Sequence, residues 1–428
     1  MTATSFIVPG MAVTDHTLTV PLRWSDEDGP TIELFYREVV DPARAAEDLP
    51  LLVFLQGGPG GKGPRPMPGA DWLPEALKHY RVVLPDQRGT GRSTPVDATV
   101  MAAHPDPAEA AGFLSCFLAD SIIADVEHLR RTRYGVRWTS LGQSYGGFLT
   151  FAYLSAHPDA LAASLITGGV PGVPASADEV YRRTFPRARR KSLDHYRRYP
   201  QDVALVSAVA DRLAEGDVTL PDGSPFSVRR LQSLGNDLGM KPGTERLHWL
   251  LDEAFAEPGR LSDGFLQDVL TRTSFAGNPL YWALQEFIYG DGACGALDWA
   301  AEREAVHHPD LGPDARPLLF TGEMTGRWMF DEITALRPFR PAVETLMRRE
   351  EWPSLYDVDA LAANEVPVQA LVYADDLYVD SDLQRQTLDR TGNAQAWVTN
   401  EFEHDGVHVA GTFTRLHQLL LDRGGARR

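Results

Sequence analysis

One serine in this sequence has neighbours that suit it to nucleophilic chemistry. Ser144 lies in GQSYGG (residues 142–147), which fits the pattern Gly-x-Ser-x-Gly. Glycines two positions before and after a serine let the backbone fold into a tight, strained turn, because they carry no Cβ. A serine on such a turn between a strand and a helix has its hydroxyl exposed to a carbonyl carbon. The predicted chemistry is acyl transfer, with backbone amides at the helix start holding the oxyanion.

The flanking residues supply the strand and the helix that this turn needs. Residues 137–141 (RWTSL) have the length of a short buried strand, and the FLTFAYLSAHP that follows has apolar residues at helical spacing until Pro158. Without that setting, the motif would indicate only an ordinary Gly-rich loop. With it, Ser144 is the candidate nucleophile, and the amide of Tyr145 is one candidate oxyanion donor.

A second glycine-rich loop comes after another strand. The continuous apolar run PLLVFL (residues 50–55) is typical of a buried parallel strand, and it leads directly into QGGPGG. A loop at this place supplies the second oxyanion amide in enzymes with a Ser elbow, and we predict Gly58 as that donor. Taken alone, the loop leaves a plain Gly/Pro turn as the alternative. We expect Arg88, in a later loop, to bond loop carbonyls beneath this region rather than a substrate.

Two late strands are each followed by the other residue types that a nucleophilic serine requires. The serine needs a base to accept its proton, and the base needs a carboxylate to fix its tautomer. The strand-like VPVQALVYA is followed by Asp375 and Asp376, and AWVTN is followed by a segment that holds His404 and His408. The chain order of serine, acid and histidine is the order expected for this type of sheet.

Turn chemistry favours one member of each pair. We predict Asp376 as the acid, because Asp375 is nearer the strand end and suits a loop-capping role. We predict His404 as the base, because it is closer to its strand and precedes a turn-forming Asp-Gly. A surface or core position is the commoner fate of a single histidine, so position and order carry this choice.

Composition narrows the classes of partner. The chain has 428 residues, 43% apolar and 23% charged, with a formal net charge of −18, which argues against nucleic acid or an anionic membrane surface. Two cysteines form no disulfide framework, and the beginning of the sequence shows no secretory signal. No run of about 18 apolar residues predicts a membrane span. We expect a cytoplasmic protein, and the sequence indicates no oligomeric state.

The order of the predicted elements indicates the fold class. Strands and helices alternate along residues 1–174 and again along 363–428, which predicts an α/β protein with a doubly wound, mostly parallel sheet. Residues 12–40 resemble an antiparallel hairpin at the edge of that sheet. Residues 175–362 are mainly amphipathic helices, which predicts an inserted helical cap domain over the strand ends. A basic portion, residues 181–200, is interpreted as a solvated helix face rather than a nucleic-acid site.

Several motifs together resemble a known family. They are GGPGG, PDQRGTGRS (residues 85–93), GQSYGG, YADDLYVD and EFEHDG. This combination is similar to the prolyl aminopeptidase (proline iminopeptidase) family of serine peptidases with the α/β-hydrolase fold, in its larger bacterial type. The resemblance covers nearly the whole chain, and it implies release of N-terminal proline from peptides without a metal or organic cofactor. The family commonly has His before its Gly-Gly-Pro-Gly, where this sequence has Gln56, so a side-chain role at that position is in doubt.

The resemblance also points to two acids in the inserted helices. An aminopeptidase must hold a charged amine away from water, and an unpaired buried cation costs several kcal/mol. The matching positions are Glu286 in ALQEFIYG and Glu323 in FTGEMTG, which we predict as substrate-binding residues. Exposed acids on amphipathic helices are the alternative. The aromatic residues around them would suit a pyrrolidine ring, namely Tyr281, Trp282, Phe287, Trp328 and Phe330.

Other functions stay open from the sequence. The nearest is a related aminopeptidase, or an amide or ester hydrolase, with a different N-terminal preference. A ligand-binding protein that keeps the fold without turnover is a further alternative, which the apparently complete set of catalytic residues disfavours. Haloalkane dehalogenases and epoxide hydrolases share the fold but use an Asp nucleophile, so Ser144 disfavours them.

Overall fold

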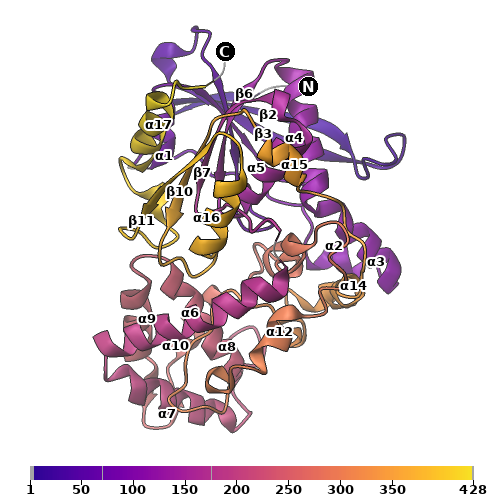
Figure 1. Ribbon diagram of the computed structural model, residues 1–428. Helices are drawn as coiled ribbons and strands as arrows, with labels where there is room; N and C mark the ends of the chain where they lie inside the picture. The colour runs from indigo at the N-terminus through magenta and orange to yellow at the C-terminus, as the bar shows by residue number, and fades with distance from the viewer. Residues whose placement is uncertain (1–3, 70, 175, 427–428) are drawn as a thin grey trace.

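One nine-stranded sheet forms the centre of the upper half of the molecule (Figure 1). The computed structural model describes residues 4–69, 71–174 and 176–426. In spatial order the strands are β1 (Thr4–Val8), β2 (Met11–Pro21), β3 (Thr31–Val40), β5 (Arg81–Pro85), β4 (Leu51–Leu55), β6 (Trp138–Gln143), β7 (Leu161–Thr167), β10 (Val368–Tyr373) and β11 (Ala394–Thr399).

The sheet is antiparallel at one edge and parallel elsewhere. β1, β2 and β3 pair antiparallel, and β3 pairs antiparallel with β5. From β5 to β11 in spatial order, successive strands are parallel to each other. The predicted α/β class with a mostly parallel, doubly wound sheet is therefore confirmed. The predicted hairpin corresponds to β2 and β3, but the edge strand is β1, whose largely exposed side chains gave no burial pattern to detect.

Helices cover both faces of the sheet. On β4, Leu51, Val53 and Leu55 belong to one apolar core, whereas Leu52 and Phe54 belong to the other, as expected for a strand buried on both sides. The first core includes α4 and α5, and the second includes α1 and α17. The helices of these parts of the chain are α1 (Trp72–Ala76), α2 (Ala98–Ala102), α3 (Pro107–Leu114), α4 (Ala119–Arg133), α5 (Tyr145–Ala156), α15 (Val358–Ala362), α16 (Ser381–Arg390) and α17 (Thr412–Asp422).

A second group of helices lies beyond one end of the sheet (Figure 1). It includes α6 (Ala177–Arg198), α7 (Asp202–Ala214), α8 (Val228–Gln232), α9 (Gly243–Asp252), α10 (Asp263–Thr273), α11 (Leu280–Leu284), α12 (Ala300–Ala305), α13 (Arg327–Glu332) and α14 (Arg340–Leu346), with a small hairpin of β8 (Phe255–Glu257) and β9 (Arg260–Leu261). Because α14 lies against α3 and α15 against α5, the chain is back on the sheet's helices before residue 363. We propose that this group of helices forms the predicted cap, and the boundaries at residues 175 and 362 stay a prediction.

The basic portion of α6 is only in part the solvated face that we expected, since Arg190 and Arg197 are exposed but other basic residues are not. Arg187 and Lys191 are mostly buried, and they pair with Asp380 and Glu403 in the second part of the sheet domain. Those acids are 193 and 212 residues away in the sequence, so no local pattern could reveal them. Among the described helices, none is long and apolar enough to cross a membrane.

Candidate active site

Ser144 stands on a strained turn between β6 and α5. Its φ is 55° and its ψ is −127°, a backbone conformation that non-glycine residues rarely adopt. A Cβ added at Gly146 would lie 1.8 Å from the Leu55 carbonyl oxygen, and one at Gly142 would lie 2.4 Å from that of Gly146. These glycines are therefore required by close backbone contacts. Ser144 remains partly exposed at the carboxyl end of β6.

The two predicted oxyanion donors lie on either side of this turn. Tyr145 is the first residue of α5, so its amide is among the N–H groups that a helix leaves unpaired. Gly58 has a φ of 130°, in the region that favours glycine. The preceding Gly57 lies against the serine, because a Cβ added there would be 2.7 Å from Ser144 Cβ. The Gln87 side chain holds this loop by donating to the Gln56 carbonyl at 2.7 Å.

Asp376 and His404 form a buried pair. His404 Nδ1 lies 2.7 Å from Asp376 Oδ2, and the other carboxylate oxygen accepts from the amides of Tyr378 and Val379 at 2.8 and 3.2 Å. Burial of the ring disfavours its protonation, but the Asp376 carboxylate outweighs this and raises the pKa of His404. The buried Nε2 of His404 has no hydrogen-bond partner among the described residues. This nitrogen is thus available to accept a proton.

Two adjacent glycines separate His404 from Ser144. A Cβ added at Gly168 would lie 3.2 Å from His404 Nδ1, and one at Gly169 would lie 3.0 Å from Ser144 Cα. The Ser144 amide donates to the carbonyl of Thr167, the residue just before them, at 2.9 Å. The serine and the imidazole are therefore neighbours across this segment, although the described residues include no hydrogen bond from the Ser144 hydroxyl to the ring.

The competing residues lie in different surroundings. Asp375 is about half exposed, and its carboxylate pairs with Arg190 at 3.2 Å. His408 is also exposed and pairs with Asp71 at 3.3 Å. Each of them therefore has its own partner at the surface, away from the buried pair of Asp376 and His404.

Glu286 is a buried carboxyl with unfilled bonding capacity. It is 1% exposed, and one oxygen accepts from the Ala300 amide at 2.5 Å. The other oxygen has no hydrogen-bond partner among the described residues. Burial raises the pKa of Glu286 to about 8. Such a group is predominantly neutral near pH 7 unless a cation comes close.

Glu323 lies nearer to the buried pair. It is partly exposed, and the hydroxyl of Tyr281 donates to it. Burial raises the pKa of Glu323 to about 7, against the Tyr281 hydrogen bond and the nearby His404, which lower it. A Cβ added at the preceding Gly322 would lie 3.3 Å from the side chain of Leu377, the residue after Asp376, so Glu323 lies beside the loop of the predicted acid.

Two tyrosines, Tyr181 and Tyr289, pack edge-on against each other, at 6.0 Å between ring centroids. Burial raises the pKa of both Tyr181 and Tyr289 well above the usual range, and the charges of Glu286 and Glu323 raise each further. Both acids therefore act on the same pair of phenols. Trp282 packs edge-on against Tyr281, at 5.0 Å between ring centroids. The other predicted aromatics behave differently: Phe287 stacks on Trp352, Phe330 meets Trp299 edge-on, and Trp328 lines a separate cavity.

The sequence reasoning missed four polar residues in this region. Gln285 is 1% exposed and acts on the pKa of Glu323, yet neither of its amide atoms reaches hydrogen-bond geometry with a described residue. Its position four residues after Tyr281, on the same helical face, was the available signal. Tyr378 lies beside His404, at 4.8 Å between ring centroids. Tyr181 and Tyr289 had no motif to mark them.

Arg88 supports the region from beneath. Its guanidinium donates to the carbonyls of Leu22 and Cys116 at 2.9 and 2.8 Å, as expected from the sequence. It also forms two bonds to Asp125, at 2.7 and 2.5 Å, which the sequence did not predict. Among the described residues, no group of three or more His, Cys, Asp or Glu side chains could hold a metal ion.

Comparisons with curated relatives and family models point to one family. The α/β hydrolase fold family matches residues 50–207. A proline iminopeptidase from Aeromonas sobria is 42% identical over 421 residues, covering 98% of this chain and 97% of the relative. The proline iminopeptidase aneH from Aspergillus aculeatus is 33% identical, covering 91% and 89%. Among solved structures, a proline iminopeptidase-related protein from Thermus thermophilus is 16% identical, with a TM-score of 0.39 and coverage of 95% and 97%.

Proposed function

The chain belongs to the proline iminopeptidase family of α/β hydrolases, and we propose that it releases N-terminal proline from peptides through Ser144, His404 and Asp376. As a member of this family it is a serine hydrolase and a prolyl aminopeptidase. Membership alone does not identify the reacting residues or the groups that hold the substrate, so the proposal for those rests on the geometry of the site.

Ser144 is the proposed nucleophile. Its hydroxyl attacks the carbonyl carbon of the N-terminal residue while His404 Nε2, which has no partner among the described residues, accepts the proton. The bond from Nδ1 to Asp376 keeps the His404 ring in the tautomer in which Nε2 can accept a proton. His404 then protonates the leaving amine, and water, deprotonated by the same ring, releases the acyl group from the serine.

The amides of Gly58 and Tyr145 are the proposed oxyanion donors. Negative charge develops on the carbonyl oxygen as Ser144 attacks, and preorganised N–H groups stabilise it without having to reorient. Removing one such donor typically costs about 3 to 4 kcal/mol of transition-state stabilisation. The contact of Gly57 with Ser144 brings this loop to the side of the nucleophile.

Glu286 and Glu323 are the proposed partners of the substrate's ammonium group. A charged amine entering this buried region lowers the pKa of both carboxyls, since an adjacent cation favours their ionised form. The cation then fills the bonding capacity that Glu286 leaves open. Gln285, whose amide is also unfilled, is suited to the second N–H of a secondary ammonium. Tyr281 and Trp282 supply an apolar wall for the ring.

One observation carries this proposal: Glu286 is buried with one carboxylate oxygen unpartnered among the described residues, and Glu323 lies beside the loop of the buried Asp376–His404 pair. A hydrolase without an amine to recognise would have no reason to bury Glu286 in this state, because a buried acid short of partners is costly. The arrangement thus favours an aminopeptidase over a general esterase. The cytoplasmic location expected from the sequence stays a prediction.

A panel of aminoacyl arylamides tests the specificity. We expect the prolyl compound to be cleaved fastest, the N-acetylprolyl compound to be nearly inert, and Ser144→Ala to abolish turnover in a folded protein. Faster cleavage of leucyl or alanyl arylamides would instead support a different N-terminal preference. Failure of a fluorophosphonate to label Ser144 in the unaltered chain would support a ligand-binding protein.

A further inference from the structure

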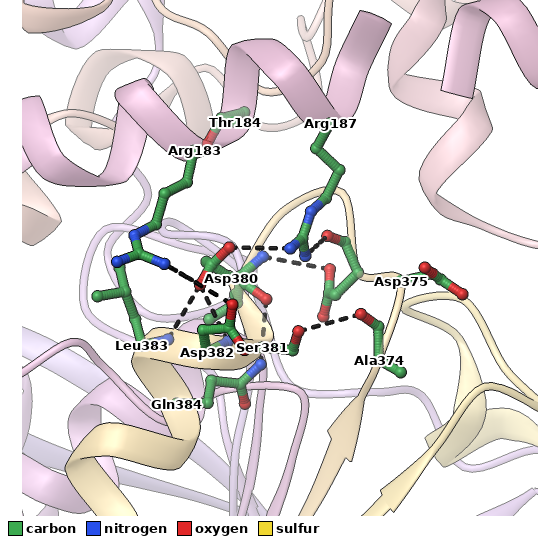
Figure 2. Close-up of polar contacts among 12 residues, drawn as sticks. Arg183, Thr184, Arg187, Ala374, Asp375, Asp380, Ser381, Asp382, Leu383 and Gln384 are labelled. Atoms are coloured by element: carbon green, nitrogen blue, oxygen red, sulfur yellow. Dashed lines mark hydrogen bonds and ion pairs between the residues drawn. The ribbon is translucent and has the colours of Figure 1, made fainter. Parts of the chain in front are cut away.

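The cap helix α6 lies against both loops that carry the proposed base and acid. Its basic residues Arg183, Arg187 and Lys191 are four positions apart, so they lie along one face of the helix. Figure 2 shows Arg183 and Arg187 pointing from α6 toward the segment that joins β10 to α16. The helix and this segment belong to parts of the chain that are almost 200 residues apart.

Arg187 ties the acid's own backbone to the start of α16. One guanidinium nitrogen donates to the Asp376 carbonyl oxygen at 2.6 Å, and another donates to Asp380 Oδ2 at 2.9 Å. The second Asp380 oxygen caps α16 by accepting from the amides of Asp382 and Leu383. The Arg187 side chain is 13% exposed, so its bonds are largely shielded from water. Arg187 therefore bridges the backbone of Asp376 and the capped start of α16.

Lys191 performs the matching task at the histidine. It pairs with Glu403, the residue just before His404, and this pair too is mostly buried. One face of a single helix thus anchors the two loops whose side chains meet in the 2.7 Å bond between Asp376 and His404. Arg183 adds a longer contact to Asp380, at 3.5 Å.

We propose that Arg187, together with Lys191, is a positioning residue: α6 sets the alignment of Asp376 with His404, so that full reactivity of Ser144 requires the cap helix to be seated. The inference rests on the proposed roles of Ser144, His404 and Asp376. A small misplacement of reacting groups is expensive, because a displacement of about 1 Å can cost about 100-fold in rate. Arg187 touches only a backbone carbonyl of the triad, so its effect is exerted through Asp376.

Other cap contacts make the variants feasible. The His404 amide donates to the Gly239 carbonyl at 2.9 Å, and the Tyr378 hydroxyl donates to the Asn236 carbonyl. These bonds hold the same two loops without Arg187 or Lys191. Loss of either basic side chain should therefore loosen the alignment while the cap remains attached.

The test compares Arg187→Met with Arg187→Lys and with Arg190→Met in the full chain. Arg190 is the matched control, since it lies on the same helix and pairs with Asp375, but that pair is half exposed. Three quantities are measured: kcat and KM for a prolyl arylamide, the rate of fluorophosphonate labelling of Ser144, and the downfield NMR signal of the proton between His404 and Asp376. Thermal unfolding is recorded in parallel.

For Arg187→Met we expect kcat and the labelling rate to fall by about 10- to 100-fold with KM little changed, and the NMR signal to weaken or shift. Arg187→Lys, which can still donate to the Asp376 carbonyl, should recover part of each loss. Arg190→Met should behave like the unaltered chain. If Arg187→Met changes only the unfolding temperature, the side chain is merely structural and the inference is wrong.

Two outcomes separate this inference from the proposed function. If the unaltered enzyme is labelled at Ser144 and Arg187→Met labels equally fast, only the positioning role fails. If Ser144→Ala retains activity, the proposed function fails, and the positioning role fails with it. Should Arg187→Met not fold, Arg187→Lys and Lys191→Met carry the same comparison: unchanged kcat and NMR signal in both would contradict the inference.

Discussion

The carboxylates on the two sides of this site have opposite bonding states. Asp376, on the sheet side, has its oxygens occupied by His404 and by two backbone amides. Glu286, on the cap side, has one oxygen with no partner among the described residues, and Glu323 relies on the Tyr281 hydroxyl. Buried polar groups are normally satisfied, so the exceptions indicate where a ligand would complete the structure. On the sheet side, the hydrogen bonds of Asp376 are thus complete before substrate arrives, whereas on the cap side those of Glu286 are not.

A substitution of Asp376, on the sheet side, should have the largest effect on activity. Asp376→Asn would present an amide to His404 and favour the wrong tautomer, for which the expected loss in kcat is about 10⁴-fold with KM little changed. Steady-state kinetics on a prolyl arylamide measures it, with Asp375→Asn as the matched control. A comparable loss from the control would exchange the two assignments.

In the same way, His404→Ala should lower kcat far more than His408→Ala.

Removing the charge of either cap glutamate, Glu286 or Glu323, should have a smaller and more selective effect on activity. Glu323→Gln or Glu286→Gln keeps the shape of the side chain but loses the negative partner of the ammonium. We therefore expect kcat/KM for prolyl substrates to fall by about 10- to 100-fold, which corresponds to about 1.4 to 2.7 kcal/mol of transition-state stabilisation. Fluorophosphonate labelling of Ser144 should proceed at its original rate, because that reagent carries no amine. Equal losses in both assays would show that the glutamates support the catalytic residues rather than the substrate.

The pH dependence distinguishes the two sides further. Binding of the ammonium needs ionised Glu323 and Glu286, and attack needs a neutral His404, so kcat/KM should rise with pH from about 7 to about 8. Burial lowers the pKa of His404, but Asp376 and then Glu323 raise it. Glu323→Gln therefore removes the titration of Glu323 and lowers the pKa of His404. The acidic limb of the profile should therefore move to lower pH in this variant. An unmoved limb would place Glu323 outside the site.

The last expected effect is on stability rather than on activity. Burial raises the pKa of Glu286 from an ordinary value of about 4.3 to about 8, so between these values the folded state holds a proton that the unfolded state releases. The free energy of unfolding should then fall with rising pH, by up to about 1.4 kcal/mol per pH unit from this group. The contribution is fully present below about pH 4.3 and lost through about pH 8.

Glu286→Gln should remove that part of the slope. Urea unfolding of both chains at several pH values within this window measures the difference, and the variant should be relatively more stable at the alkaline end. Parallel slopes for the two chains would mean that Glu286 titrates normally in the folded protein.

The features that sequence could predict are local or depend on chain order. Glycines beside Ser144 and the aspartate and histidine after two late strands reflect turn geometry and the direction of a parallel sheet, and both leave marks in short segments. The fold class was predictable from the same alternation. The partners of Arg187 and Lys191 were not, because they lie about 190 and 210 residues away. Gln285, Tyr181 and Tyr289 were also hidden, since nothing local separates a buried polar side chain facing a ligand from one satisfied in a core.

The ratio of kcat/KM for a prolyl arylamide to that for its N-acetyl derivative tests the central claim most directly. The claim is that Glu286 and Glu323 bind the charged amine of the substrate beside an Asp376–His404 pair that is already formed. We expect a large ratio in the unaltered chain and a much smaller one in Glu323→Gln, with most of the change in the prolyl substrate. A ratio near one in the unaltered chain, or the same ratio in both proteins, would contradict the account.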